Sequence, residues 1–180
     1  MNRLLSLFAL LLLCFPTGVV AQEFTPPEPT AEHELLKQFE GQWLTECEFM
    51  GMPGQEVCKG SLSCRMLGQF WVINEMDADA GGQPMKAVQT IGYDRKEKKF
   101  IGTWVDSMTD FQWDYSGKWL EDKKQLVMEA EGPSFTDPEK KTDFRDSYQF
   151  VEKDLIRFES SMKDEAGKWV TFARGEFKRK

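Results

Sequence analysis

Residues 111–120 read FQWDYSGKWL, and their alternation decides the fold class. Aromatic side chains occupy positions 111, 113, 115 and 119, and polar side chains occupy positions 112, 114, 116 and 118. Because successive side chains of a β-strand point to opposite faces, this period of two predicts a strand with one aromatic face. An aromatic face has to be buried, so we predict that Trp113 and Tyr115 point into the core.

The same alternation recurs along most of the chain. Ten runs of this kind, separated by turn residues, lie near 43–50, 57–67, 69–79, 86–93, 99–108, 111–121, 124–132, 142–151, 154–163 and 168–178. Short connections make consecutive strands antiparallel and leave no room for crossover helices. We therefore predict an all-β fold, an up-and-down antiparallel barrel of about ten strands. A short helix precedes it, capped by Thr30 and ended by Gly41.

Hairpin geometry predicts which side chains face each other inside the barrel. A two-residue turn at 109–110 places Trp104 opposite Tyr115, and Asp106 opposite Trp113. We expect all four side chains to line a ligand site. A desolvated Asp106 could also act as the general base of a small isomerase-type enzyme. Alternatively, Asp106 orders the hairpin through Ser107 and Thr109.

Two charged residues of the later strands are also predicted to face inward. Period two places Asp146 opposite Ser160, and Arg174 opposite Phe158. An arginine in an aromatic interior needs a carboxylate partner, because an unpaired buried charge is very costly. Arg174 is therefore either an anchor for an anionic ligand or the ion-pair partner of Asp146, unless a slipped register leaves it in solvent.

Three cysteines follow the N-terminal segment. A four-residue turn at 51–54 places Cys47 directly opposite Cys58, whereas Cys64 lies six residues further along its strand. At about 3.3 Å per residue, Cys64 is too distant for a bond that tolerates at most about 7 Å between Cα atoms. We predict a Cys47–Cys58 disulfide and a free Cys64, with three reduced core cysteines as the alternative.

The N-terminus has the pattern of a secretory signal peptide. A positive start at Asn2-Arg3 precedes an apolar stretch over 4–15, and small residues end the segment at Ala21. A lipoprotein anchor at Cys14 is the alternative. We thus divide the chain into a signal peptide (1–21), a Pro-rich leader (22–29) and a barrel domain (30–180). No other apolar stretch approaches the roughly 20 residues of a transmembrane helix, so we expect a secreted or periplasmic protein without a transmembrane segment.

Charge and composition exclude some classes of function. The chain of 180 residues has a formal net charge of −7, and removal of 1–21, with one Arg and no acid, makes it −7 − 1 = −8. Nucleic acids require a basic face, so we expect no nucleic-acid partner. Aromatic residues make up 13% of the chain, which is enough to line a barrel.

Several short motifs point to a known family. Gly41-Gln42-Trp43 resembles the Gly-x-Trp motif of lipocalins and other calycin barrels. The resemblance implies that Trp43 packs across the closed end of the barrel against a basic residue of the last strand, Arg179 or, second, Arg174. The Gly-x-Trp motif is one of several that resemble domain-of-unknown-function family 1579, a group of bacterial lipocalin-like proteins. The others include Gly92-Tyr93-Asp94, residues 103–108 (TWVDSM) and the terminal residues 177–179, and the resemblance covers residues 30–180. That resemblance implies no established activity.

Catalytic and metal motifs are scarce in the sequence. His33 is the one histidine, and neither a nucleophile elbow nor a phosphate-binding loop occurs. We predict no metal site and no cofactor, haem held by His33 being the alternative. We therefore favour a non-enzymatic protein that binds a small hydrophobic or amphipathic molecule in its aromatic barrel. The alternatives are a filled structural or protein-interaction barrel and the isomerase-type enzyme using Asp106.

Overall fold

The computed structural model describes residues 25–51, 57–137 and 139–180. The predicted signal peptide and the start of the leader lie outside these residues. The described elements are α1 (Ala31–Leu36), η1 (Lys37–Phe39), β1 (Gly41–Phe49), β2 (Val57–Leu67), β3 (Trp71–Ala80), β4 (Pro84–Asp94), β5 (Lys99–Asp106), β6 (Trp113–Leu120), η2 (Glu121–Lys123), β7 (Gln125–Pro133), β8 (Lys141–Glu152), β9 (Leu155–Lys163) and β10 (Trp169–Arg179).

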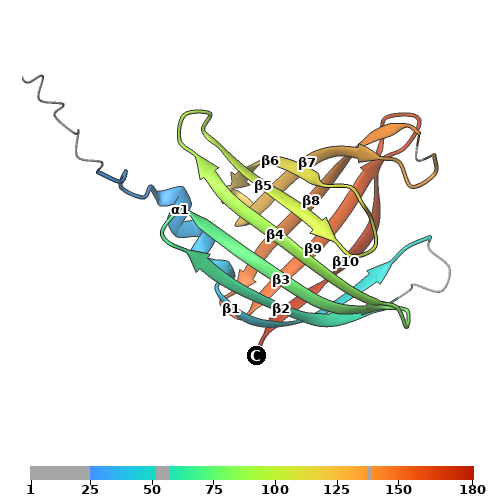
Figure 1. The fold of residues 1–180 in the computed structure, drawn as a ribbon, viewed down its shortest axis with the longest axis horizontal. Coiled ribbons are helices and arrows are strands. Elements are labelled where there is room, and N and C mark those ends of the chain that lie inside the picture. Colours follow the sequence, from blue (N-terminus) through green and yellow to red (C-terminus); the bar gives the residue numbers. More distant parts are fainter. Residues whose placement is uncertain (1–24, 52–56, 138) are drawn as a thin grey trace, which may run out of the picture.

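The ten strands form one closed antiparallel barrel in which each strand pairs with its neighbours in the sequence. The last strand, β10, pairs with β1 and closes the barrel (Figure 1). The predicted fold class is confirmed, and every predicted strand corresponds to an observed one. Closure leaves no unpaired sheet edge, which explains how short strands can form a stable domain.

The short helix plugs one end of the barrel (Figure 1). Thr30 is its N-cap, as predicted, and forms a capping box with His33. Leu36 and Phe39 are buried against Trp43, which is itself fully buried. This apolar cluster fills the helix end of the interior. No helix among the described residues has the length and apolar character needed to cross a membrane.

The β5–β6 hairpin differs from its predicted register by two residues. Trp104 lies opposite Trp113, and Gly102 lies opposite Tyr115, so the predicted Trp104–Tyr115 and Asp106–Trp113 pairs are wrong. The connection runs from residue 107 to 112 and is longer than the predicted two-residue turn. An even shift preserves the face of every side chain, and Trp113 and Tyr115 therefore still point inward.

A β-bulge in β10 reverses the direction predicted for Arg174. The pairing with β9 shifts between Thr171 and Ala173, and the extra residue inverts the alternation of the strand beyond it. Gly175, not Arg174, lies opposite Phe158. Arg174 faces solvent and forms an ion pair with Glu48, with 64% of its side chain exposed. Of the alternatives for Arg174, the inward anchor and the Asp146–Arg174 pair are wrong, and the shifted register that leaves Arg174 in solvent is the one observed.

The predicted disulfide is also wrong, although its register is correct. Cys47 lies directly opposite Cys58, as predicted, but Cys47, Cys58 and Cys64 are all free and buried. The structure has the alternative arrangement, three reduced cysteines in the core.

Candidate functional site

A cavity of about 320 Å³ lies within the barrel and opens at the end opposite α1. Aromatic side chains make up much of its wall, namely Trp104, Trp113, Tyr115, Phe144, Tyr148 and Phe158. The side chains of Met108 and Phe135, from the loops at this end, also contact the cavity and are exposed to solvent. Its volume is within the range of small-molecule pockets, about 300–1,000 Å³. The interior is thus filled at the helix end and hollow at the other.

Packing between the aromatic rings holds the shape of the cavity. The ring centroids of Trp113 and Phe144 are 4.5 Å apart with the planes at 72°. Trp113 also lies over Gly132, where a Cβ atom would overlap its ring. Edge-to-face pairs of this kind add about 0.5–1.5 kcal/mol to the burial of their surfaces. Gly132 therefore provides the recess that Trp113 occupies.

Asp146 is the buried acid of this cavity. Its carboxylate accepts hydrogen bonds from Ser160 Oγ and from the hydroxyl of Tyr115, the latter at 2.8 Å. The predicted pairing of Asp146 with Ser160 is confirmed. Desolvation raises the pKa of Asp146, and the two hydroxyl donors only partly offset this effect. Burial and the nearby Asp146 together hold the pKa of Tyr115 well above its usual value.

A second polar chain crosses the interior above the apolar plug. Asn74 donates from Nδ2 to Gln89 Oε1 at 3.0 Å, and Gln89 donates from Nε2 to the hydroxyl of Tyr148 at 2.9 Å. Gln89 and Tyr148 line the cavity. Gln89 is a site residue that was not predicted from the sequence. Its signal was the alternation of Met85, Ala87 and Gln89 in β4, which places a polar residue on an otherwise apolar inner face.

Asp106 lies at the mouth of the cavity and has three hydrogen-bond donors. Its Oδ2 accepts from Trp104 Nε1 at 2.8 Å. Its Oδ1 accepts from the amides of Met108 and Thr109 at 2.8 and 3.1 Å. These bonds order the β5–β6 loop and orient the Trp104 ring toward the cavity, which agrees with the ordering role considered for Asp106.

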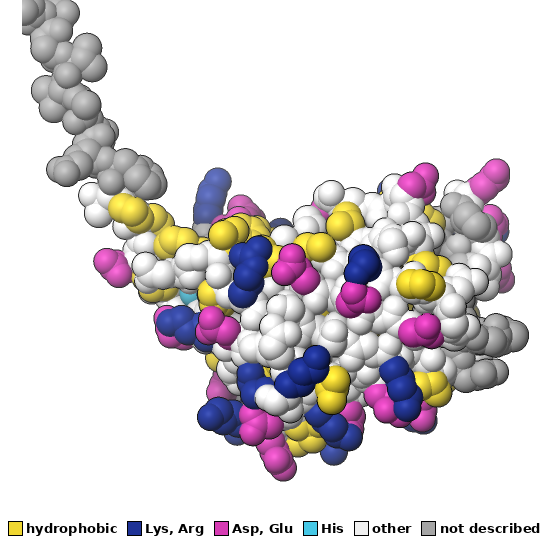
Figure 2. Space-filling view, turned by 60° about the horizontal axis from the view of Figure 1, so that its bottom comes forward, with side chains coloured by type: hydrophobic (Ala, Val, Ile, Leu, Met, Phe, Trp, Pro, Cys, Tyr) yellow, Lys and Arg dark blue, Asp and Glu magenta, His cyan; other side chains and the backbone are white. Residues whose placement is uncertain are grey.

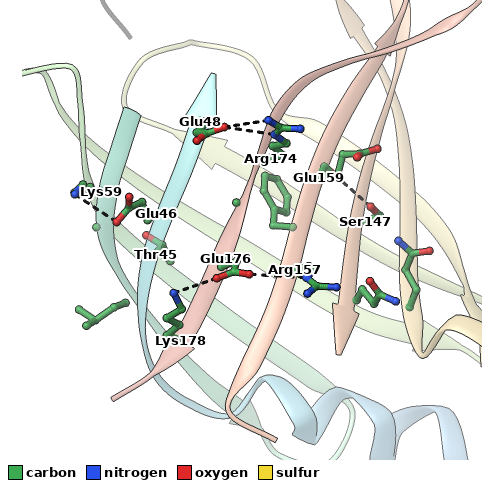
Figure 3. Close-up of a pocket in the computed structure, with 16 residues that line it drawn as sticks. Thr45, Glu46, Glu48, Lys59, Ser147, Arg157, Glu159, Arg174, Glu176 and Lys178 are labelled. Atoms are coloured by element: carbon green, nitrogen blue, oxygen red, sulfur yellow. Dashed lines mark hydrogen bonds and ion pairs between the residues drawn. The ribbon is translucent and has the colours of Figure 1, made fainter. Parts of the chain in front are cut away.

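Arg174 belongs instead to a groove of about 840 Å³ on the outer surface of β8, β9, β10 and β1 (Figure 3). All charged side chains of this groove except Glu159 pair with one another. The pairs are Arg174–Glu48, Lys59–Glu46, Arg157–Glu176 and Lys178–Glu176. All of these side chains are at least 40% exposed, and such pairs contribute about 0–1 kcal/mol each. The face shown in Figure 2 likewise mixes acidic and basic side chains. We therefore place the candidate site inside the barrel.

The closed end has the geometry that the Gly-x-Trp resemblance implied. The Arg179 guanidinium lies 4.0 Å from the centroid of the Trp43 ring. Gly41 has φ +131°, and a Cβ atom there would collide with the Arg179 guanidinium. The positive φ favours glycine at this position. Gly41, Trp43 and Arg179 thus close the barrel and do not contact the cavity.

His33 is a packing residue at the same end. It is buried between Phe70 and Tyr93, with ring centroids 5.2 and 5.8 Å away. Its Nδ1 accepts a hydrogen bond from the amide of Thr30 at 2.9 Å. Burial lowers the pKa of His33, which favours the neutral ring. His33 is not among the residues that line the cavity.

Comparisons with known proteins agree with this fold. A family model described as "Protein of unknown function (DUF1579)" matches residues 28–179. No curated protein matches the sequence. The crystal structure of Rv2717c from M. tuberculosis is similar, with a TM-score of 0.61, 11% identity, and coverage of 85% of this chain and 99% of that chain. At this identity the likeness shows the fold alone.

Two further barrels, both bound to the compound DFHBI, are more distant. EF1p2_mFAP2b has a TM-score of 0.47 and 6% identity, and covers 82% of this chain and 98% of its own. The redesigned barrel mFAP1 has a TM-score of 0.43 and 10% identity, and covers 81% of this chain and 98% of its own.

Proposed function

The chain belongs to the DUF1579 family of proteins of unknown function, and from its site we propose that it binds a small apolar or amphipathic molecule inside the barrel. The single observation that carries the proposal is the cavity of about 320 Å³ at the end opposite α1. A barrel that served only as a scaffold would gain stability by filling that space, because burial of apolar surface contributes about 25 cal/mol per Å².

The chemistry of the wall supports an apolar or amphipathic ligand. Aromatic and methionine side chains supply large apolar contacts, and the few polar groups are clustered around Asp146 and Gln89. Pockets for small organic molecules have this composition, with a few polar groups that set the orientation of the ligand. The exposed Met108 and Phe135 at the mouth provide an apolar path of entry.

A binding assay with N-phenyl-1-naphthylamine, a neutral dye that fluoresces in apolar surroundings, tests the proposal. We expect saturable binding, weakened about tenfold by Trp104→Ala because a ring of the wall is lost. Trp169→Ala is the matched control, since Trp169 stacks on Arg145 with 3.9 Å between the guanidinium and the ring centroid, away from the cavity lining. Equal dye binding by both variants, or no saturable binding by the wild type, would favour a structural or protein-interaction barrel.

We also propose that the protein is exported to the periplasm or the medium. The support is the positive start, the apolar stretch over 4–15 and the small residues before Gln22. Intact-mass analysis of the protein from its host tests this proposal. We expect a chain that begins at Gln22, and a chain that retains residues 1–21 would contradict it. A lipid-modified Cys14 would show the anchor instead.

A further inference from the structure

The cavity wall is unusual in the charges that it holds. Two carboxylates, Asp106 and Asp146, line the cavity, and no Lys, Arg or His is among its described lining residues. Asp106 is held at the mouth by two backbone amides and an indole N–H. Asp146 lies deeper and is only 7% exposed. The interior therefore presents negative potential without a cationic counterpart.

Asp146 has hydrogen-bond donors but no compensating charge. Its two partners, Tyr115 and Ser160, are neutral hydroxyls. None of the ion pairs formed by the described residues includes Asp146. A buried carboxylate is normally paired with a cation or bound to a metal, because desolvation of an ionised group is costly. A ligand that brings a positive charge would supply the missing partner.

The aromatic rings around Asp146 favour the same ligand charge. Tyr148 and Phe158 have ring centroids 5.3 Å apart, and Trp113 and Phe144 are 4.5 Å apart. The faces of aromatic rings carry negative potential and attract organic cations by about 0.5–2 kcal/mol, more strongly when water is excluded. The same faces and the carboxylate would repel an anion. The aromatic wall of the cavity and the carboxylate of Asp146 therefore both favour a positively charged ligand over an anion.

The mouth of the cavity has a matching charge. The described residues of the connections at this end include the acids Asp110, Asp137, Glu139, Asp164 and Glu165, and the bases Lys140 and Lys168. An excess of acids around an entrance raises the local concentration of cations and speeds their association. This effect depends on ionic strength, whereas the contact with a buried carboxylate is screened far less.

We propose that the cavity binds an organic cation, a protonated amine on an apolar body, with the ammonium group donating hydrogen bonds to Asp146 and the body packed among the aromatic rings. This inference rests on the proposed function and specifies its ligand class. It replaces the anionic ligand expected from an inward Arg174. The volume of about 320 Å³ suits a body of one to three rings.

Three probes of similar size and different charge test the inference. They are 2-phenylethylammonium, the neutral 2-phenylethanol and the anionic 3-phenylpropionate, titrated at pH 8 with detection by tryptophan fluorescence or calorimetry. We expect the cation to bind at least tenfold more tightly than the alcohol, and the anion to bind more weakly than either. This comparison needs only the wild-type protein, so it does not depend on the folding of any variant.

Two variants then assign the preference to Asp146. Asp146→Asn keeps the shape and the hydrogen-bond acceptor but removes the charge, and we expect it to weaken the cation at least tenfold and the alcohol less than threefold. Asp143→Asn is the matched control. It lies on the outer face of the same strand, where Asp143 accepts a hydrogen bond from Lys163 at 2.6 Å. It should leave all three probes unchanged.

The outcomes distinguish the preference for a cationic ligand from the proposed binding of an apolar or amphipathic molecule, on which it rests. Equal affinities for cation and alcohol, tighter binding of the anion, or an unchanged cation affinity in Asp146→Asn would overturn the cationic preference. Binding of N-phenyl-1-naphthylamine would still support an apolar ligand in those cases. Failure of the dye and of all three probes to bind the wild type would overturn both.

Discussion

The guanidinium of Arg179, near the C-terminus, lies 4.0 Å from the centroid of the fully buried Trp43 ring at the start of β1. The two residues are partners in the β1–β10 ladder that closes the barrel. Arg179 also donates hydrogen bonds to the carbonyls of Gln38 and Glu40. One side chain therefore ties the last strand both to the first strand and to the end of the helical plug.

We expect Arg179→Ala to lower the free energy of unfolding by about 2–4 kcal/mol, because it removes the cation–π contact and leaves backbone carbonyls unpartnered. Urea denaturation followed by tryptophan fluorescence measures the change. Arg174→Ala is the control, since its exposed pair with Glu48 contributes less than about 1 kcal/mol. Similar losses in the two variants would contradict the role of Arg179 at the closed end.

The three buried thiols should be unreactive in the native protein. Burial raises the pKa of Cys47 and of Cys64 to about 12, and it also raises the pKa of Cys58. At pH 8 a thiol of that pKa is ionised to about 10⁻⁴, and the thiolate is the reactive form. We expect a protein that begins at Gln22 to react very slowly with an aromatic disulfide reagent. After denaturation it should release three equivalents, and one equivalent would instead indicate a disulfide.

Asp146 should make stability depend on pH in a defined direction. Burial raises its folded-state pKa above the ordinary value of 3.8, so the folded state binds the proton more tightly than the unfolded chain does. The corresponding stabilisation is fully present below that value and is lost as pH rises through the folded-state pKa. Asp146→Asn removes this loss.

We therefore expect the unfolding free energy of Asp146→Asn, minus that of the wild type, to increase as pH rises from 3.8 toward neutrality. Denaturant titrations of both proteins at several pH values, without ligand, measure the difference. Tyr115 and Tyr148, which lie close to Asp146, stay neutral over this range because burial raises their pKa values well above 10. A difference that is constant or decreases with pH would argue against a buried, unpaired Asp146.

Gly132 should control the size of the cavity. A Cβ atom at this position would overlap the Trp113 ring, so Gly132→Ala has to displace that ring. We expect a loss of about 1–3 kcal/mol in stability from overpacking and a change in affinity for N-phenyl-1-naphthylamine. Glu131→Ala, on the outer face of the same strand, removes only an exposed ion pair with Lys141 and should change neither. Unchanged dye binding in Gly132→Ala would show that Trp113 does not shape the site.

Local patterns in the sequence were sufficient to predict the strands and, except beyond the bulge in β10, their inward faces. The alternation at Trp113 and Tyr115 requires one buried face whatever the pairing, and a register error of two residues leaves that face unchanged. The same reasoning predicted the Asp146–Ser160 pair and the inward position of Trp104. The closed-end contact of Trp43 with Arg179 followed from a resemblance, and it too is present.

Other features were decided only by the tertiary structure. They depend on irregularities of the backbone and on the volume that the packed side chains fill. The extra residue in β10 carries no sequence signal that separates it from a regular strand, yet it turns Arg174 outward and leaves Asp146 without a cation. The length of the β5–β6 connection likewise set which aromatic rings meet. Whether the interior is full or hollow depends on how the plug of Leu36, Phe39 and Trp43 packs at one end. A period of two tells which side chains point inward, but only their packed volumes in three dimensions determine the space that remains between them.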